Sequence, residues 1–574
     1  MGLALIDWII IGLYLALSLG VGLYFTRQAG KDIREYFLSG RKLPWWLLGT
    51  SMVATTFGAD TPLAVTEYVR NEGIWRNWFW WNAALGGLLS VFLFSRLWRR
   101  AEVLTDNELI ELRYSGRPAA ILRAFKAGYF ATLYNFVVMG WVIQAMATVL
   151  QVVLGIPREM QWLSIALCVV ISLVYTVLSG LWGVVATDLF QFGLAMAGSI
   201  ILAIFSLKEI GGIGELKIRL AEVSTVNDST LYFLPPLDVG SSHFWTSPFF
   251  TFIIFITVMW WATHHADGGG YIIQRMLAAK SEGHSLVGTL WFSVAHYALR
   301  PWPWIIVALV SLVTFPHHPA KEAYPATINF LPPGLRGLLV VSFLAAFMST
   351  IVTHVNWGSS YFINDIYKRF IVKEASERHY ILVSRISGAV LMVIAGGVAT
   401  QMDSITKAWE FLAPMAAGIG LVLILRWFWW RINAWSEISA LIASVVINIL
   451  LELMGVGIQY RFALIVPSSI IIWVTVTFLT RPVPKEKLME FYQKVRPGGF
   501  WRPIQKELPH IKKGIIGWGL AVDWFSGVAL IYGTTFGIGE MVFQEYAQGL
   551  ILLGMAALGA AVISYRLTRK EAFQ

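Results

Sequence analysis

A long apolar segment of the sequence is interrupted by ionisable side chains and three glycines, in Thr263-His264-His265-Ala266-Asp267-Gly268-Gly269-Gly270. Each glycine weakens a helix by about 1 kcal/mol relative to alanine. A second interruption, Ala54-Thr55-Thr56-Phe57-Gly58-Ala59-Asp60-Thr61, places a candidate helix break at Gly58 beside an embedded Asp60. Non-helical backbone persists at membrane depth only where it lines a cavity or is buried in protein. The two stretches therefore predict two broken membrane helices.

The composition around these stretches is that of a membrane protein. Of the 574 residues, 57% are hydrophobic and 14% charged, whereas soluble domains have about 25% charged residues. The 27 Trp, 20 Tyr and 35 Phe exclude intrinsic disorder. The single cysteine excludes an intramolecular disulfide and a cysteine-based metal cluster.

Segments of about 20 apolar residues, the length that crosses a bilayer, recur along the chain. About fifteen such segments are predicted: 5–26, 44–68, 75–98, 120–154, 161–180, 184–206, 246–274, 284–315, 335–366, 379–401, 405–425, 433–455, 460–480, 515–537 and 547–565. With the N-terminus outside, most of the 44 Lys and Arg residues fall in the inner loops, as the positive-inside rule requires. We therefore expect a multi-pass protein of the cell membrane with a cytoplasmic C-terminus.

The two interruptions lie five segments apart, in the first and sixth segments that follow the opening one. Paired interruptions in two halves of a chain indicate an inverted-repeat transporter with its site at the midplane. This pattern predicts one transmembrane domain over 1–574, with an extra helix at 5–26, a first repeat at 44–206, an inverted second repeat at 246–425 and further helices at 433–565. The alternative is that the glycines only allow close helix packing.

The long inner loop 481–514 is expected to carry a short amphipathic helix from Lys485 to Val495 at the membrane surface. Its lysines and arginines, and those of Arg96-Leu97-Trp98-Arg99-Arg100, are interpreted as topology signals and contacts to lipid headgroups. Binding to nucleic acid is not expected. The first segment is interpreted as a retained helix, because it lacks a basic leader and a cleavage site.

The segment 335–366 carries a compact group of oxygen atoms. Ser349 and Thr350 lie three and four residues after Ala346, on the same helix face. Their hydroxyls can reach the Ala346 carbonyl, and hard cations such as Na⁺ prefer oxygen ligands. In membrane helices the hydroxyls of serine and threonine usually donate to such a backbone carbonyl. The alternative is therefore that Ser349 and Thr350 have a structural role only.

Several stretches resemble the sodium:solute symporter family, which includes sodium/glucose, sodium/proline and sodium/sialate transporters. The matching stretches are Trp45 to Ser51, Gly183 to Gln191, Tyr271 to Lys280 and Ala345 through Asp365-Ile366-Tyr367. The resemblance implies an all-α polytopic fold with a five-plus-five inverted-repeat (LeuT-like) core. One extra N-terminal helix and about four extra C-terminal helices would complete it.

The resemblance also implies a sodium site. Its ligands would be the carbonyls of Ala54, Phe57 and Ala346 with the hydroxyls of Ser349 and Thr350. Some members bind a second sodium ion, and Asp188, Ser349 and Thr353 match the positions of its ligands.

Val352 stands where such members carry a serine, so a second sodium ion is in doubt. Asp188 is then a candidate for the ion exit path, and Na⁺ is the only cofactor expected.

The candidate solute-binding residues differ from those of the sugar-transporting members. They are Asp60, Thr61, Trp80, Trp261, His265, Asp267 and His296. Tryptophans can stack on a sugar-like face or a cation, although each also fits an interfacial or packing role. Arg300-Pro301-Trp302-Pro303 is interpreted as a kinked outer end of its helix. There a structural ion pair is expected for Arg300, and the alternative is that Arg300 binds a carboxylate of the solute.

These observations predict a symporter, not an enzyme, that couples Na⁺ influx to uptake of a small polar organic solute by alternating access. A sugar, amino acid, organic acid or osmolyte would fit, and a monomer would suffice. The nearest alternative is a proton-coupled symporter in which Asp60, Asp188 or His265 carries the proton. A membrane sensor derived from a transporter is the second alternative. A membrane enzyme built on His264, His265 and Asp267 is the third.

Overall fold

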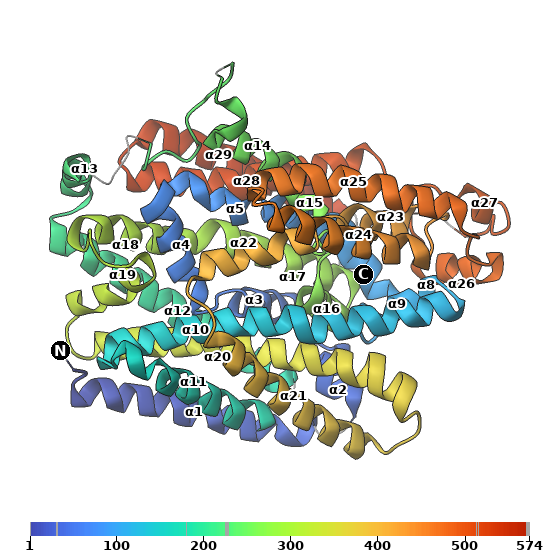
Figure 1. Cartoon of the computed structure of the whole chain (residues 1–574), viewed down its shortest axis with the longest axis horizontal. Coiled ribbons are helices and arrows are strands. Elements are labelled where there is room, and N and C mark those ends of the chain that lie inside the picture. Colours follow the sequence, from blue (N-terminus) through green and yellow to red (C-terminus); the bar gives the residue numbers. More distant parts are fainter. Residues whose placement is uncertain are drawn as a thin grey trace.

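The computed structural model describes residues 2–29, 32–178, 181–223, 229–240, 242–511, 514 and 516–569. All regular elements among these residues are helices, apart from two isolated bridges. The long helices run roughly along the horizontal axis of Figure 1, with α1 and α11 at one side and α28 and α29 at the other.

The predicted apolar segments correspond to the helices of the structure. In the described part of the chain, twelve helices are long and apolar enough to cross a membrane. A further predicted segment, 405–425, is the pair α22 (Ile405–Met415) and α23 (Gly420–Phe428), which is bent by 47°. The other two predicted segments, 44–68 and 246–274, are broken helices, so neither forms one continuous span.

The first break lies between α3 (Trp45–Thr55) and α4 (Asp60–Glu72). The Phe57 amide still donates to Ala54 O at 3.1 Å, after which the helical hydrogen bonds stop. A side chain at Gly58 would place its Cβ 2.0 Å from Asp60 Oδ1. Glycine therefore lets the Asp60 carboxylate lie against the open backbone. The helix break predicted at Gly58 is confirmed.

The second break separates α15 (Trp260–Ala262) from α16 (Gly270–Ala278). Gly268, Gly269 and Gly270 have φ values of +125°, +69° and +35°, a region that residues with a Cβ rarely adopt. The three glycines thus build the turn that opens this helix.

The helices form two groups joined by α12 (Leu181–Ile210). The first group contains both broken helices together with α6 (Ala83–Leu89), α7 (Ser95–Ala101), α17 (Glu282–Val294) and α18 (Pro301–Thr314). The second contains α10 (Asn135–Leu154), α11 (Gln161–Leu178), α20 (Leu335–Tyr361) and α21 (Glu377–Ala399). α1 (Leu5–Ala29) packs on α12 and α20.

The C-terminal part adds two helical pairs. α24 (Ala434–Leu453) packs on α25 (Ile458–Leu479), and α28 (Trp518–Val542) packs on α29 (Tyr546–Arg569). Hydrogen bonds tie α28 to the first group. Tyr532 Oη donates to Trp81 O at 2.9 Å, and Thr535 Oγ1 donates to Tyr297 O at 3.0 Å. Trp524 Nε1 donates to Leu85 O on α6 at 3.0 Å, and Trp302 Nε1 on α18 donates to Thr535 O at 2.6 Å.

The helix predicted in the inner loop is confirmed as α26 (Lys485–Val495), with Leu488 and Phe491 buried. It packs on α7 and α8 (Glu108–Arg113). The remaining α-helices are α2 (Ile33–Leu38), α5 (Trp78–Trp81), α9 (Gly116–Tyr129), α13 (Ile213–Glu222), α14 (Pro248–Ile254), α19 (Ala320–Ala326) and α27 (Arg502–Gln505).

Among the described residues, four of the twelve spans contain a π-helical segment: η3 (Ser90–Phe94), η4 (Phe130–Tyr134), η8 (Ala295–Leu299) and η10 (Phe362–Ile371). The broken helix 246–274 contains another, η7 (Phe255–Met259). Such segments occur frequently at functional sites.

Candidate functional site

A cavity of about 340 Å³ lies between the two broken helices. Five of the seven predicted solute-binding residues line it: Asp60, Thr61, Trp80, His265 and His296. Its volume is at the lower end of the range for ligand pockets, about 300–1,000 Å³. The cavity therefore suits a small solute.

Aromatic residues form much of the cavity wall. Trp80 was predicted from the sequence, but most of the other aromatic lining residues were not: these others are Phe79, Tyr134, Trp141, Trp260, Tyr271, Phe292, Tyr297, Trp357 and Trp409. Tyr134 and Trp141 lie seven residues apart, two helical turns on one face, so their spacing was an available signal. They show that the span containing α10 contributes to the cavity.

Thr56, at the end of α3, connects several polar cavity residues. Its Oγ1 lies 2.9 Å from His296 Nδ1, and its carbonyl accepts a 3.4 Å bond from Thr61 Oγ1. Trp80 lies against His296, with ring centroids 5.7 Å apart. The break in the first helix thus brings these three predicted residues together.

Arg300 lines the same cavity and is only 1% exposed. It precedes α18 in the middle of the span Glu282–Thr314, and not at an outer end as the sequence analysis suggested. The favoured interpretation as a structural ion pair is also wrong, because no carboxylate of the described residues lies within 4.0 Å of its guanidinium. Its nearest partners are neutral groups.

Two predicted residues do not line the cavity. Trp261 is on α15 but donates its Nε1 to Thr257 O at 2.7 Å, outside the cavity lining. Asp267 is buried, and its Oδ2 accepts from Arg426 Nη2 at 2.6 Å and from Trp427 Nε1 at 3.0 Å. The second break therefore turns Asp267 towards α23, where it forms a buried ion pair.

The predicted oxygen cluster adjoins the cavity where α20 meets the end of α3. Thr350 Oγ1 lies 3.0 Å from Ala346 O, the carbonyl one turn earlier, and 2.7 Å from Thr55 O on α3. Ala54 O accepts the bond from the Phe57 amide described above. The Thr55 carbonyl was not predicted from the sequence, because only the crossing of α3 and α20 brings it to Thr350.

Ser349 faces Asp188 on α12. Its Oγ donates to Asp188 Oδ1 at 2.5 Å, while Ser51 Oγ on α3 donates to Asp188 Oδ2 at 2.5 Å. Thr353, one turn further along α20, lies 3.0 Å from Thr55 Oγ1 and accepts from Arg275 Nη2 at 2.8 Å. The buried Arg275 guanidinium of α16 therefore lies within the group of oxygens proposed for a second ion.

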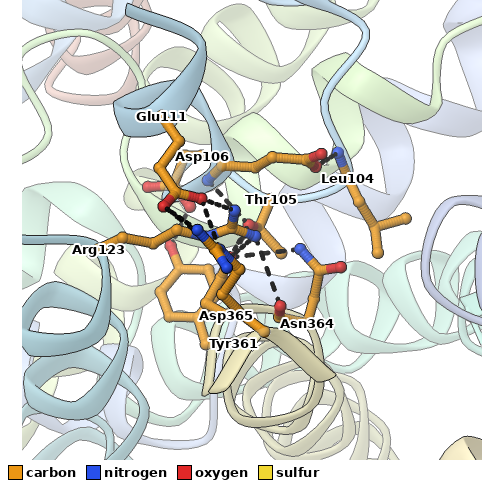
Figure 2. Close-up of polar contacts among 10 residues, drawn as sticks. Leu104, Thr105, Asp106, Glu111, Arg123, Tyr361, Asn364 and Asp365 are labelled. Atoms are coloured by element: carbon orange, nitrogen blue, oxygen red, sulfur yellow. Dashed lines mark hydrogen bonds and ion pairs between the residues drawn. The ribbon is translucent and has the colours of Figure 1, made fainter. Parts of the chain in front are cut away.

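The C-terminal end of α20 is fixed by a second buried network, drawn in Figure 2. Asp365 accepts from Thr105 Oγ1 at 2.8 and 2.9 Å and pairs with Arg123 at 2.7 Å. Arg123 also donates to Glu111 at 2.7 Å. The Asp365-Ile366-Tyr367 stretch, quoted above for its resemblance alone, thus joins η10 to α8 and α9.

Comparisons with known proteins give one consistent result. The family model described as "Sodium:solute symporter family" matches residues 36–444. A sodium/glucose cotransporter of Vibrio parahaemolyticus is 26% identical, over 80% of this chain and 87% of its own length. A sodium/mannose cotransporter of Bos taurus is 27% identical over 78% of each chain.

A solved structure of a Na⁺-coupled sialic acid symporter, in a substrate-bound outward-open state, has the same fold. It superposes with a TM-score of 0.69 at 20% identity, and covers 84% of this chain and 99% of its own. The predicted all-α, LeuT-like fold is therefore confirmed.

Proposed function

The chain belongs to the sodium:solute symporter family, and from this premise we propose that it couples Na⁺ influx to uptake of a small polar organic solute. The family and its named relatives support a multi-pass membrane transporter driven by sodium. The relatives are named for different sugars, so their names leave the solute of this chain open.

The position of Thr350 Oγ1 between Ala346 O and Thr55 O is the observation that carries the proposal. Three oxygens meet there from a continuous helix and from the end of a broken one. With Ala54 O, Phe57 O and Ser349 Oγ, they offer the oxygen ligands that a hard cation prefers. A bound Na⁺ would join α3 to α20, one helix from each group.

We propose one tightly coupled sodium ion for each solute. Val352 lacks the oxygen that a second site would need, and Thr353 already accepts from Arg275. Asp188, with Ser51 and Ser349 as its partners, would serve as a relay for sodium leaving towards the inside.

The energy for uptake would come from the sodium gradient. A sodium ion that moves down 100 mV yields about 2.3 kcal/mol, and each tenfold concentration ratio adds about 1.4 kcal/mol. One ion can thus drive accumulation of roughly a hundredfold or more. Sodium binding would favour the outward-open state, and closure of the helix groups over the solute would then open the inner side.

The domain division and orientation predicted from the sequence complete the proposal. A single transmembrane domain, with an N-terminal helix, two five-helix repeats and C-terminal helices, would lie in the cell membrane with the C-terminus in the cytoplasm. A monomer with its surrounding lipids would suffice for transport.

The direct test is uptake by purified protein in liposomes. Solute should accumulate when an inward Na⁺ gradient is imposed, and should not accumulate when K⁺ replaces Na⁺ or when only a proton gradient is present. Accumulation that follows the proton gradient without Na⁺ would refute the proposal and favour the proton-coupled alternative.

A further inference from the structure

The cavity contains an arginine, Arg300, that forms no ion pair with the described residues; the Asp60 carboxylate, which lines the same cavity, lies more than 4.0 Å from its guanidinium. Arg300 Nε lies 3.2 Å from His296 O, and its two terminal nitrogens lie 3.4–3.5 Å from Thr56 Oγ1, Val53 O and His296 Nε2. Strong guanidinium bonds to oxygen are about 2.7–2.9 Å long. The guanidinium is thus buried, surrounded by neutral groups and weakly hydrogen-bonded.

Such an arrangement is costly unless a ligand completes it. A buried charge without a counter-ion costs several kcal/mol, and a guanidinium presents a planar set of donors that matches a carboxylate with two parallel bonds. The rings of Phe57 and Trp304, 5.5 and 5.2 Å from the guanidinium carbon, lie against Arg300 and restrict its position.

We propose that the solute carries a single carboxylate, which binds Arg300, on a body of about monosaccharide size. The inference deepens the proposed function and rests on it, because it names the class of solute that the sodium-coupled cavity accepts. A sugar acid such as a hexuronate fits this description.

The charges around the cavity favour a monoanion. Among the described cavity-lining residues, Asp60 and Arg300 are the charged ones. Just beyond them, Ser51 Oγ donates to Asp188 Oδ2 and accepts from Arg275 Nε, so a second acid and a second base lie close together. These four charges cancel. One Na⁺ bound beside Thr350 then leaves one positive charge in a low-dielectric region, where an uncompensated charge is unfavourable. A monoanion neutralises it, whereas a neutral sugar or a zwitterion does not, and a dianionic phosphate adds excess negative charge.

The rest of the cavity suits a polyhydroxylated body. Asp60 is the first residue of α4, so the positive end of that helix stabilises its carboxylate and no cationic ligand is required. This carboxylate can accept a bond from a hydroxyl, and Thr61 and His296 add neutral polar groups. The faces of Trp80 and Trp260 can cover the apolar side of a sugar ring.

The test is a ligand-binding comparison with the purified full-length protein in detergent, with NaCl or KCl. The probes are glucuronate and galacturonate, each against its neutral counterpart, glucose or galactose, with glucose 6-phosphate and proline added. In NaCl we expect at least one uronate to raise the thermal-unfolding midpoint at a concentration at least tenfold lower than its neutral counterpart requires.

Three variants separate the outcomes. Arg300→Gln should lower the preference for the uronate over the neutral sugar at least tenfold, and Arg300→Lys should retain part of it. Arg158→Gln, at an exposed arginine paired with Glu322, is the matched control and should retain it fully.

The proposal is overturned if a neutral sugar, glucose 6-phosphate or proline binds more tightly than the uronates, or if no uronate binds. It is also overturned if Arg300→Gln weakens the uronate and the neutral sugar equally, which would indicate a structural role for Arg300. A failure of the proposed sodium coupling would give a different result. The probes would then raise the thermal-unfolding midpoint equally in NaCl and in KCl.

Discussion

Replacing Thr350 with alanine removes one oxygen from the proposed sodium site and leaves the helix intact, since alanine is the better helix former. The hydroxyl lies 2.7 Å from Thr55 O and 3.0 Å from Ala346 O. An interaction between a hydroxyl and a charged group contributes about 1.5–3 kcal/mol, and 1.4 kcal/mol corresponds to a factor of ten. The Na⁺ concentration for half-maximal uptake should therefore rise roughly 10- to 150-fold.

The assay is initial uptake rate against Na⁺ concentration in liposomes that contain equal amounts of folded protein. Thr350→Ser keeps the oxygen and should stay within a few-fold of the unmodified protein. Ser342→Ala is a matched control, because Ser342 lies two turns earlier on α20 and donates to Leu194 O, away from the cluster. Unchanged sodium dependence in both Thr350→Ala and Ser349→Ala would refute the sodium site.

Three further predictions concern ion number, the second break and the network around Glu111 and Asp365. The reversal potential of the reconstituted protein should correspond to one Na⁺ transported per solute. Val352→Ser should raise the Hill coefficient or the affinity for Na⁺. Two Na⁺ per solute in the unmodified protein would contradict this prediction. Asp267→Asn should destabilise the protein by about 3–5 kcal/mol, measured by thermal unfolding, because it leaves Arg426 buried without its closest partner. The solute concentration for half-maximal uptake should change by no more than about threefold, because Asp267 does not line the cavity. Burial tends to raise the pKa of Glu111, but hydrogen bonds from Arg369 and Arg123 outweigh it and lower that pKa. Ionised Glu111 therefore stabilises the fold above about pH 4.3, the ordinary pKa of a glutamate. At pH 7 the unfolding midpoint of Glu111→Gln should be lower than that of the unmodified protein. The two midpoints should converge as the pH drops below about 4, where Glu111 becomes protonated.

The sequence predicted the positions of both helix breaks because their cause is local. Gly58 and the glycines at 268–270 weaken a helix whatever surrounds them, and the structure shows the breaks there. The amphipathic pattern of 485–495 is equally local, and the helix has those bounds.

The site was predicted less completely, because side-chain partners depend on how distant helices cross. The partner of Asp267 is Arg426, 159 positions later in the chain, and no spacing rule links the two. Embedded charge alone made Asp267 and Asp60 equivalent candidates, yet one forms an ion pair and the other lines the cavity. Conversely, Arg300 was expected to form an ion pair, but the packing places no carboxylate of the described residues within 4.0 Å of its guanidinium.

The attachment of α28 to the first helix group has a consequence for experiments. Because hydrogen bonds to Trp81 O, Tyr297 O and Leu85 O tie this helix to the first group, we expect the helix and that group to move together. A spin label near Trp518, which is 89% exposed at the start of α28, would therefore move with that group. A second label on α1, which packs on α20, would mark the other group. The distance between the labels, measured with and without Na⁺, would follow the transport cycle without any change to the cavity itself.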